Sequence, residues 1–217
     1  MSLLRPLVPL WLGACLGLGC ATVSVPPAPT STARAGAPSG IDARLLTFLD
    51  EAFDARLALS PQALTELGLK QDYGRLDDYT DAGAQKALAL AEAQLARMNQ
   101  EFEPAALSPE ARLSFRLFEA DVAQQRRRLR WRSHEYAVST MNSPAGQLSV
   151  FLINNHRVDS VEDARAYVSR LRDVRRVLEE ISARLRAQAE HGVVPPQFVF
   201  EPVVADTRRV LTGAPFD

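Results

Sequence analysis

From residue 41 onward, apolar residues recur every three or four positions, and no convincing run alternates between apolar and polar residues. This period is typical of amphipathic α-helices. Residues that start or stop helices divide the pattern, at Pro61, Gly68, Pro104, Pro109, Gly192 and Pro195. The sequence therefore predicts an all-α protein, a bundle of long helices that forms part of a larger helical fold.

The predicted helices differ greatly in length. They cover residues 42–59, 61–67, 84–102, 109–129, 161–191 and 198–211. We expect the helices at 84–102 and 109–129 to pack antiparallel, the second through Leu113, Leu117, Ala120 and Leu129. The helix at 161–191 opens with the capping box Ser160 to Asp163. Its expected buried face carries Val161, Ala164, Val168, Leu171, Val174, Leu178, Ile181 and Leu185, and the stretch before its cap is expected to be a loop.

The first forty residues predict export. One charge, Arg5, precedes an apolar run that is too short to span a bilayer comfortably, which is the plan of a signal peptide over residues 1–19. Cys15 and Cys20 both follow small residues, as lipoprotein processing sites do. We favour lipidation at Cys20, because it leads directly into a Pro, Ala, Ser and Thr-rich tether over residues 20–40. A plain signal peptide with two incidental cysteines is the alternative.

Composition narrows the possible chemistry. The chain has 217 residues, 24% of them charged, and a net charge of -1, so it lacks the basic excess of a nucleic-acid binder. Its two cysteines both lie in the leader, which excludes a cysteine protease and a cysteine zinc site in residues 41–217. We therefore expect no nucleic-acid partner and a membrane contact through the N-terminal lipid alone.

One strong run of positive charge stands out, with five arginines and Trp131 between Arg126 and Arg132. It could meet phosphate or an anionic lipid surface. Helical spacing distributes the arginines around the axis, however, and carboxylates at Glu119, Asp121 and Glu135 flank them. A solvated, salt-bridged helix end is the interpretation we favour.

The chain has three histidines, and none forms a recognisable metal motif. His134-Glu135 begins like His-Glu-x-x-His, but Val138 occupies the fifth position. His191 lies at a predicted helix C-terminus, where it can cap the helix. His156 either contributes to a substrate cleft or satisfies backbone groups before a helix cap. We predict no catalytic residue and no cofactor or metal ligand in this chain.

Residues Met141 to Leu171, reading MNSPAGQLSVFLINNHRVDSVEDARAYVSRL, resemble the bacterial domain-of-unknown-function 885 family. Further landmarks of the resemblance occur at residues 60–68 and 192–199. The resemblance implies a helical, often lipid-anchored, zinc metallopeptidase-like protein that acts on peptide-like substrates. In that family the zinc motif, a His-Glu-x-x-His-type helix, lies well C-terminal of the matching stretch, and this sequence contains no counterpart.

Two hypotheses follow for residues 41–217. In the first, they are the N-terminal region of an exported, lipid-anchored zinc metallopeptidase, with the metal motif in a missing C-terminal region, and they are inactive alone. In the second, they form a non-catalytic helical binding or scaffold module of the cell envelope. Both place the protein at a membrane surface facing the periplasm or the exterior.

Overall fold

The structure is a computed structural model that describes residues 40–212. All of the described residues belong to the larger of two units of the chain, which spans Ala37–Asp217. The expected signal peptide, Cys15, Cys20 and the tether up to residue 39 lie outside the described residues. The fold below is that of the larger unit.

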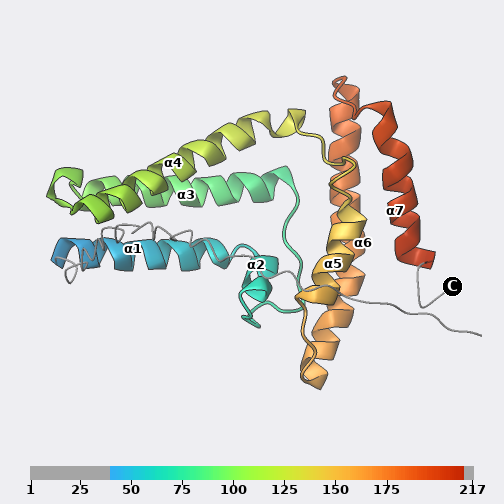
Figure 1. The fold of residues 1–217 in the computed structure, drawn as a ribbon, viewed down its shortest axis with the longest axis horizontal. Coiled ribbons are helices and arrows are strands. Elements are labelled where there is room, and N and C mark those ends of the chain that lie inside the picture. The colour runs from blue at the N-terminus through green and yellow to red at the C-terminus, as the bar shows by residue number, and fades with distance from the viewer. Residues whose placement is uncertain (1–39, 213–217) are drawn as a thin grey trace, which may run out of the picture. The chain divides into compact units, whose positions relative to one another are not determined.

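Seven α-helices and three short 3-10 helices make up the described residues, which contain no strand (Figure 1). The elements are α1 (Gly40–Leu57), α2 (Pro61–Glu66), α3 (Asp81–Glu101), η1 (Pro104–Ala106), α4 (Pro109–Trp131), η2 (Arg132–His134), α5 (Pro144–Asn154), α6 (Val161–Glu190), η3 (Gln197–Val199) and α7 (Phe200–Thr212). The all-α prediction is confirmed.

Helices α1, α3 and α4 share one hydrophobic core. In Figure 1, α3 and α4 lie side by side as an antiparallel hairpin with α1 along α3, as the sequence predicts for the two longer helices. Phe48 of α1 makes edge-to-face contacts with Phe102 and Phe118, at ring-centroid distances of 5.8 and 6.1 Å. The buried members are Leu45, Phe48, Ala52, Met98, Phe102, Leu107, Ala111 and Phe115.

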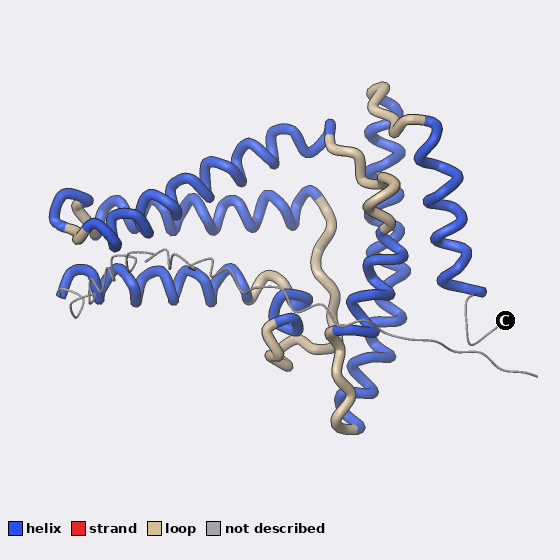
Figure 2. Tube along the Cα trace, viewed as in Figure 1, coloured by secondary structure: helices blue, strands red, loops and turns tan. Residues whose placement is uncertain are grey.

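A second core lies between α5 and α6, which run beside each other in Figure 2. Its buried members are Leu76, Ala137, Leu148, Phe151, Leu152, Val177 and Ile181. Leu76 and Ala137 come from the two long connections that precede α3 and α5. This core therefore holds loops as well as helices, and it supports the candidate site described below.

Hydroxyl side chains begin most of the helices. Ser60, Ser108, Ser143 and Ser160 each accept a hydrogen bond from the amide three residues later, as Thr80 does for Gly83. Such caps satisfy an amide that the helix itself leaves free and are worth about 1 kcal/mol each. The breaks that the sequence indicates at residues 60–61, 108–109 and 160–161 are confirmed.

The prediction of a loop throughout the stretch before Ser160 is wrong, because residues 144–154 form α5. Ser143 caps this helix, Pro144 occupies its first turn and the Asn155 amide donates to the Phe151 carbonyl at its end. The run from Val150 to Ile153 is continuously apolar, which hides a helical period. The capping residues at its two ends, Ser143 and Asn155, were the available signal of a helix.

The buried faces predicted for α4 and α6 are partly wrong. Leu113 and Leu117 are 59% and 61% exposed, whereas Ala111, Phe115 and Val122 are buried. On α6 the solvent-exposed residues of the predicted face are Val161, Val168 and Leu171. The face that is buried on α6 carries Asp163, Arg170, Val177, Ile181 and Gln188. Three polar side chains, those of Asp163, Arg170 and Gln188, therefore lie on the buried face, where the apolar period does not predict them.

Among residues 40–212, no helix is both long and apolar enough to cross a bilayer.

Candidate functional site

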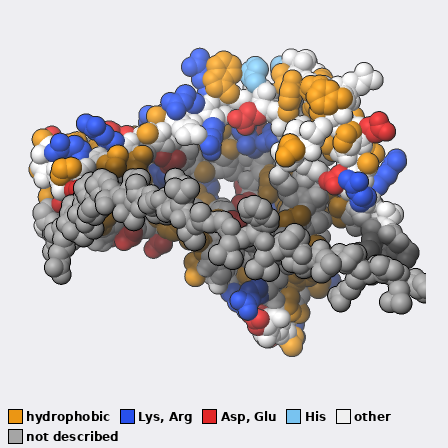
Figure 3. Space-filling model, in the orientation of Figure 1, with side chains coloured by type: hydrophobic (Ala, Val, Ile, Leu, Met, Phe, Trp, Pro, Cys, Tyr) orange, Lys and Arg blue, Asp and Glu red, His pale blue; other side chains and the backbone are white. Residues whose placement is uncertain are grey.

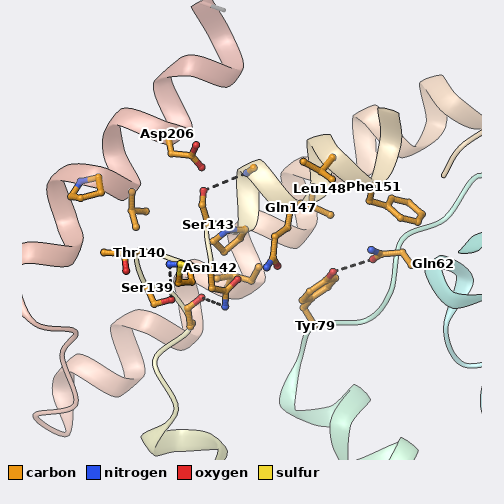
Figure 4. Close-up of a pocket in the computed structure, with 18 of the residues that line it drawn as sticks. Gln62, Tyr79, Ser139, Thr140, Asn142, Ser143, Gln147, Leu148, Phe151 and Asp206 are labelled. Atoms are coloured by element: carbon orange, nitrogen blue, oxygen red, sulfur yellow. Dashed lines mark hydrogen bonds between the residues drawn. The ribbon is translucent and has the colours of Figure 1, made fainter. Parts of the chain in front are cut away.

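A cleft of about 680 Å³ opens between the 137–143 segment and helices α5, α6 and α7 (Figure 4). Gln62 and Glu66 of α2 and Tyr79 also line it. The wall combines apolar side chains with hydroxyls, amides and charged groups. The polar residues that line it are Gln62, Glu66, Tyr79, Ser139, Thr140, Asn142, Ser143, Gln147, Asn155, Arg184, Asp206 and Arg209.

The 137–143 segment is held in a tight turn. Ser139 and Asn142 exchange backbone hydrogen bonds of 3.0 and 3.1 Å, and Met141 at the tip is 90% exposed. Gln188 of α6 anchors the preceding residues, because its side-chain amide donates to the carbonyls of Arg132, Ser133 and Glu135. The turn therefore projects over the cleft from a fixed base.

Tyr79 and Gln62 are hydrogen-bonded to each other at the cleft wall. The Tyr79 hydroxyl donates to Gln62 Oε1 over 3.1 Å, and the Tyr79 amide donates to Glu180 over 3.2 Å. Burial raises the pKa of the Tyr79 hydroxyl, so it stays protonated near neutral pH. Figure 4 shows Gln147 projecting from α5 between Asn142 and Tyr79.

Helix α7 covers the cleft close to the first turn of α5. A Cβ added at Gly146 would lie 2.7 Å from Asp206 Oδ2, so a side chain there would force the Asp206 carboxylate to shift. Hydrogen bonds from Ser143, and then from Arg209, lower the pKa of the Asp206 carboxyl. Arg209 pairs with Asp206 over 3.3 Å. The charges of α7 at the cleft are thus mutually compensated.

Arg184 of α6 also lines the cleft, and its situation differs from that of Arg209. Its Nε atom is buried and has no hydrogen-bond partner among residues 40–212. Burial lowers the pKa of its guanidinium, and the positive charge of Arg132 acts in the same direction. Because arginine remains charged even so, the cleft wall carries a positive charge without a bonded partner.

A buried polar cluster lies beside the cleft, centred on Arg170, which is 0% exposed. Its guanidinium donates to the carbonyls of Arg75 and Pro61 and to the Thr65 hydroxyl, over 2.8, 3.1 and 2.7 Å. It also donates to His156 Nδ1 over 2.9 Å. One side chain thereby joins α2, the segment before α3 and the turn between α5 and α6.

His156 is neutral in this cluster. Arginine can only donate, so Nδ1 is the acceptor and Nε2 carries the proton that is donated to the Asp163 carbonyl over 3.1 Å. The Tyr73 ring stacks on the imidazole at a centroid distance of 4.0 Å. Burial, together with the nearby Arg170 charge, lowers the pKa of His156. His156 does not line the cleft, and its contacts are those expected of a residue that satisfies backbone groups.

The other two histidines also have structural contacts. His191 Nδ1 lies 2.8 Å from the Ala187 carbonyl, which confirms the expected cap at the end of α6. His134 contacts the Ser133 hydroxyl over 3.0 Å and the edge of Trp131. Within residues 40–212, no three His, Cys, Asp or Glu side chains lie close enough together to hold a metal ion.

The arginine run at the end of α4 forms salt bridges, although with partners other than those expected. Arg126 pairs with Glu92 over 2.6 Å and Arg132 with Asp81 over 2.7 Å. Both carboxylates belong to α3, so the run ties the hairpin together. On the face drawn in Figure 3, basic side chains are dispersed among acidic and apolar ones.

Comparison with protein-family models identifies one family, described as "Bacterial protein of unknown function (DUF885)", over residues 61–217. The match covers well over half of the chain. The chain belongs to this family. No curated protein and no solved structure matches it. The family assignment made from Met141 to Leu171 is therefore confirmed.

The matched region of this DUF885 member contains every residue that lines the cleft. Sequence reasoning located the 141–156 segment but not the cleft, whose walls come from segments far apart in the chain. Arg184 was also missed. Its only signal is its place three residues after Ile181, on the side of α6 that is buried.

Proposed function

We propose that this chain is the ligand-binding part of an exported, lipid-anchored DUF885 protein, and that its cleft holds a peptide-like substrate. The cleft between α5, α6 and α7 carries the proposal. Its apolar side chains, among them Leu148, Val150 and Val203, can accommodate aliphatic groups. The side-chain amides of Gln147 and Asn155 have no hydrogen-bond partner among the described residues, and they match the groups of a peptide backbone.

We further propose that hydrolysis is performed by zinc bound to a His-Glu-x-x-His-type helix, as the family resemblance implies. That helix has no counterpart in the printed sequence. In this division of roles the described residues bind and orient the substrate. Reading the DNA beyond the Asp217 codon in all three frames tests this part, because a downstream His-Glu-x-x-His-type sequence would support it and an unrelated gene would contradict it.

Binding to the cleft can be tested with trileucine and isothermal titration calorimetry. Gln147 is exposed and lines the cleft, so Gln147→Trp should fill the space and abolish binding without disturbing a core. Ile153→Trp is the matched control, because Ile153 is 75% exposed on the same helix and does not line the cleft. This variant should bind as the wild type does.

Two results would contradict the proposal. If trileucine does not bind the wild type, the alternative of a scaffold module without a peptide site is favoured. If the purified chain binds and also hydrolyses trileucine, the division between substrate binding and zinc chemistry is wrong.

A further inference from the structure

The cleft has a single guanidinium without a compensating contact. Arg209 is paired with Asp206, whereas Arg184 has no ion pair within 4 Å and no hydrogen bond among residues 40–212. Two other arginines of α6, Arg170 and Arg176, have hydrogen-bond or ion-pair partners. Arg184 is therefore the residue through which α6 brings an unpaired charge to the cleft.

The carboxylates near Arg184 do not form an ion pair with it. Asp81 and Glu135 favour its charged form through space, but Asp81 is bonded to Arg132 and neither carboxylate reaches Arg184. Arg132 opposes that charge. The buried Nε is closed to the cleft, so the guanidinium lines the cleft through its remaining atoms and brings an uncompensated positive charge to the wall.

We infer that Arg184 binds the C-terminal carboxylate of a short peptide held in the cleft. A guanidinium offers five donors in a planar fork, which fits the two oxygens of a carboxylate. The amides of Gln147 and Asn155 and the aliphatic groups of Leu148 and Val150 line the same space and can contact the rest of the peptide. The inference rests on the proposed function, and it adds which end of the peptide is recognised.

The size of the cleft agrees with a short peptide. Its volume of about 680 Å³ lies in the range of sites for small ligands. Met141 at the tip of the 137–143 turn is 90% exposed and lines the cleft, so the site is open to solvent on that side.

Trileucine and trileucine amide test this inference, because they differ only in the terminal carboxylate. The wild type should bind trileucine at least ~10-fold more tightly than the amide, as expected for a charge-assisted hydrogen-bonded pair. Arg184→Met keeps an aliphatic stem and removes the charge, so it should bind both peptides equally. Arg186→Met is the matched control: Arg186 is exposed on the same helix, does not line the cleft, and its replacement should preserve the preference for the acid.

Folding of Arg184→Met can be checked separately. Because the substitution removes a buried Nε that has no partner, the variant should melt no lower than the wild type by circular dichroism.

The outcomes separate this inference from the function on which it rests. If both peptides bind the wild type with the same affinity, or if Arg184→Met still prefers the acid, the inference is overturned and the peptide site stands. If neither peptide binds the wild type, the proposed function fails and the inference fails with it.

Discussion

At the scale of single residues, His156 and Arg170 show how burial controls protonation. Arg170 donates to His156 Nδ1 over 2.9 Å, so an added proton at Nδ1 would remove the acceptor and place two positive charges side by side. Burial is the main cause of the lowered pKa of His156, and the Arg170 charge acts in the same direction. Below its ordinary pKa of 6.5, the unfolded chain therefore binds a proton that the folded chain resists.

We predict that the free energy of unfolding falls as the pH decreases below 6.5. The sign follows from proton counts, because the unfolded state binds more protons than the folded state in this window. The slope from one such group cannot exceed about 1.4 kcal/mol per pH unit. Urea unfolding of the wild type and of His156→Gln between pH 7 and pH 5 measures it, and the variant should show the smaller slope.

His191→Gln is the matched control, since it removes an exposed histidine at the end of α6 and leaves the contact between His156 and Arg170 in place. Equal slopes in the wild type and in His156→Gln would contradict the prediction. Asp163 acts in a separate window, because Lys70 and other donors lower its pKa to about 2 and its stabilisation is lost only as the pH falls below 3.8.

The sequence could not indicate this cluster. Asp163, Arg170 and Gln188 are charged or polar, and such residues are mostly exposed. Their partners come from distant segments: Arg170 and Gln188 donate to carbonyls of Pro61, Arg75 and Arg132, and Lys70 donates to Asp163. A helical period contains no information about such distant acceptors.

At the scale of elements, α7 is the least firmly attached wall of the cleft. None of its residues is buried, although it contacts α5. Elements with few buried contacts open locally at a low free-energy cost. The close approach of α7 at Gly146 is therefore a sensitive point of the fold.

We predict that Gly146→Leu detaches α7 while the rest of the protein stays folded. The leucine side chain would collide with Asp206, which lies 2.7 Å from the position of an added Cβ. Leucine also favours a helix over glycine by up to ~1 kcal/mol, so α5 itself should not be weakened. Limited trypsin digestion should cut faster after Arg208 and Arg209, with little change in the melting temperature.

Asn154→Leu serves as the matched control, because Asn154 is exposed on α5 and does not line the cleft. It should leave the cleavage rate unchanged. Wild-type protection of Arg208 and Arg209 in Gly146→Leu would show that α7 does not depend on this contact.

At the scale of the whole molecule, the N-terminal leader and the helical region have separate roles in the proposal. The leader would place the helical region at a membrane surface through one lipid group, whose acyl chain contributes about 0.8 kcal/mol for each buried methylene. The cleft would then work within the helical region. The leader and its cysteines lie outside residues 40–212, so this role is argued from sequence.

We predict that palmitate is incorporated at Cys20. Metabolic labelling should mark the wild type and Cys15→Ala but not Cys20→Ala. The Cys15→Ala variant is the matched control, because it removes the other cysteine of the chain. Labelling that persists in Cys20→Ala and disappears in Cys15→Ala would assign the lipid to Cys15. No labelling of the wild type would contradict lipid anchoring.

The sequence by itself determined the helical class, most helix limits and the family. Those properties depend on local chemistry: Ser60, Ser108 and Ser160 cap helices through amides three residues away. Tertiary structure alone decided which faces are buried, why Leu113 and Leu117 are exposed, and where the cleft opens. The physical reason is that burial and pairing depend on partners distant in the chain. The role proposed for Arg184 can therefore be argued only from the distant segments that line the cleft with it.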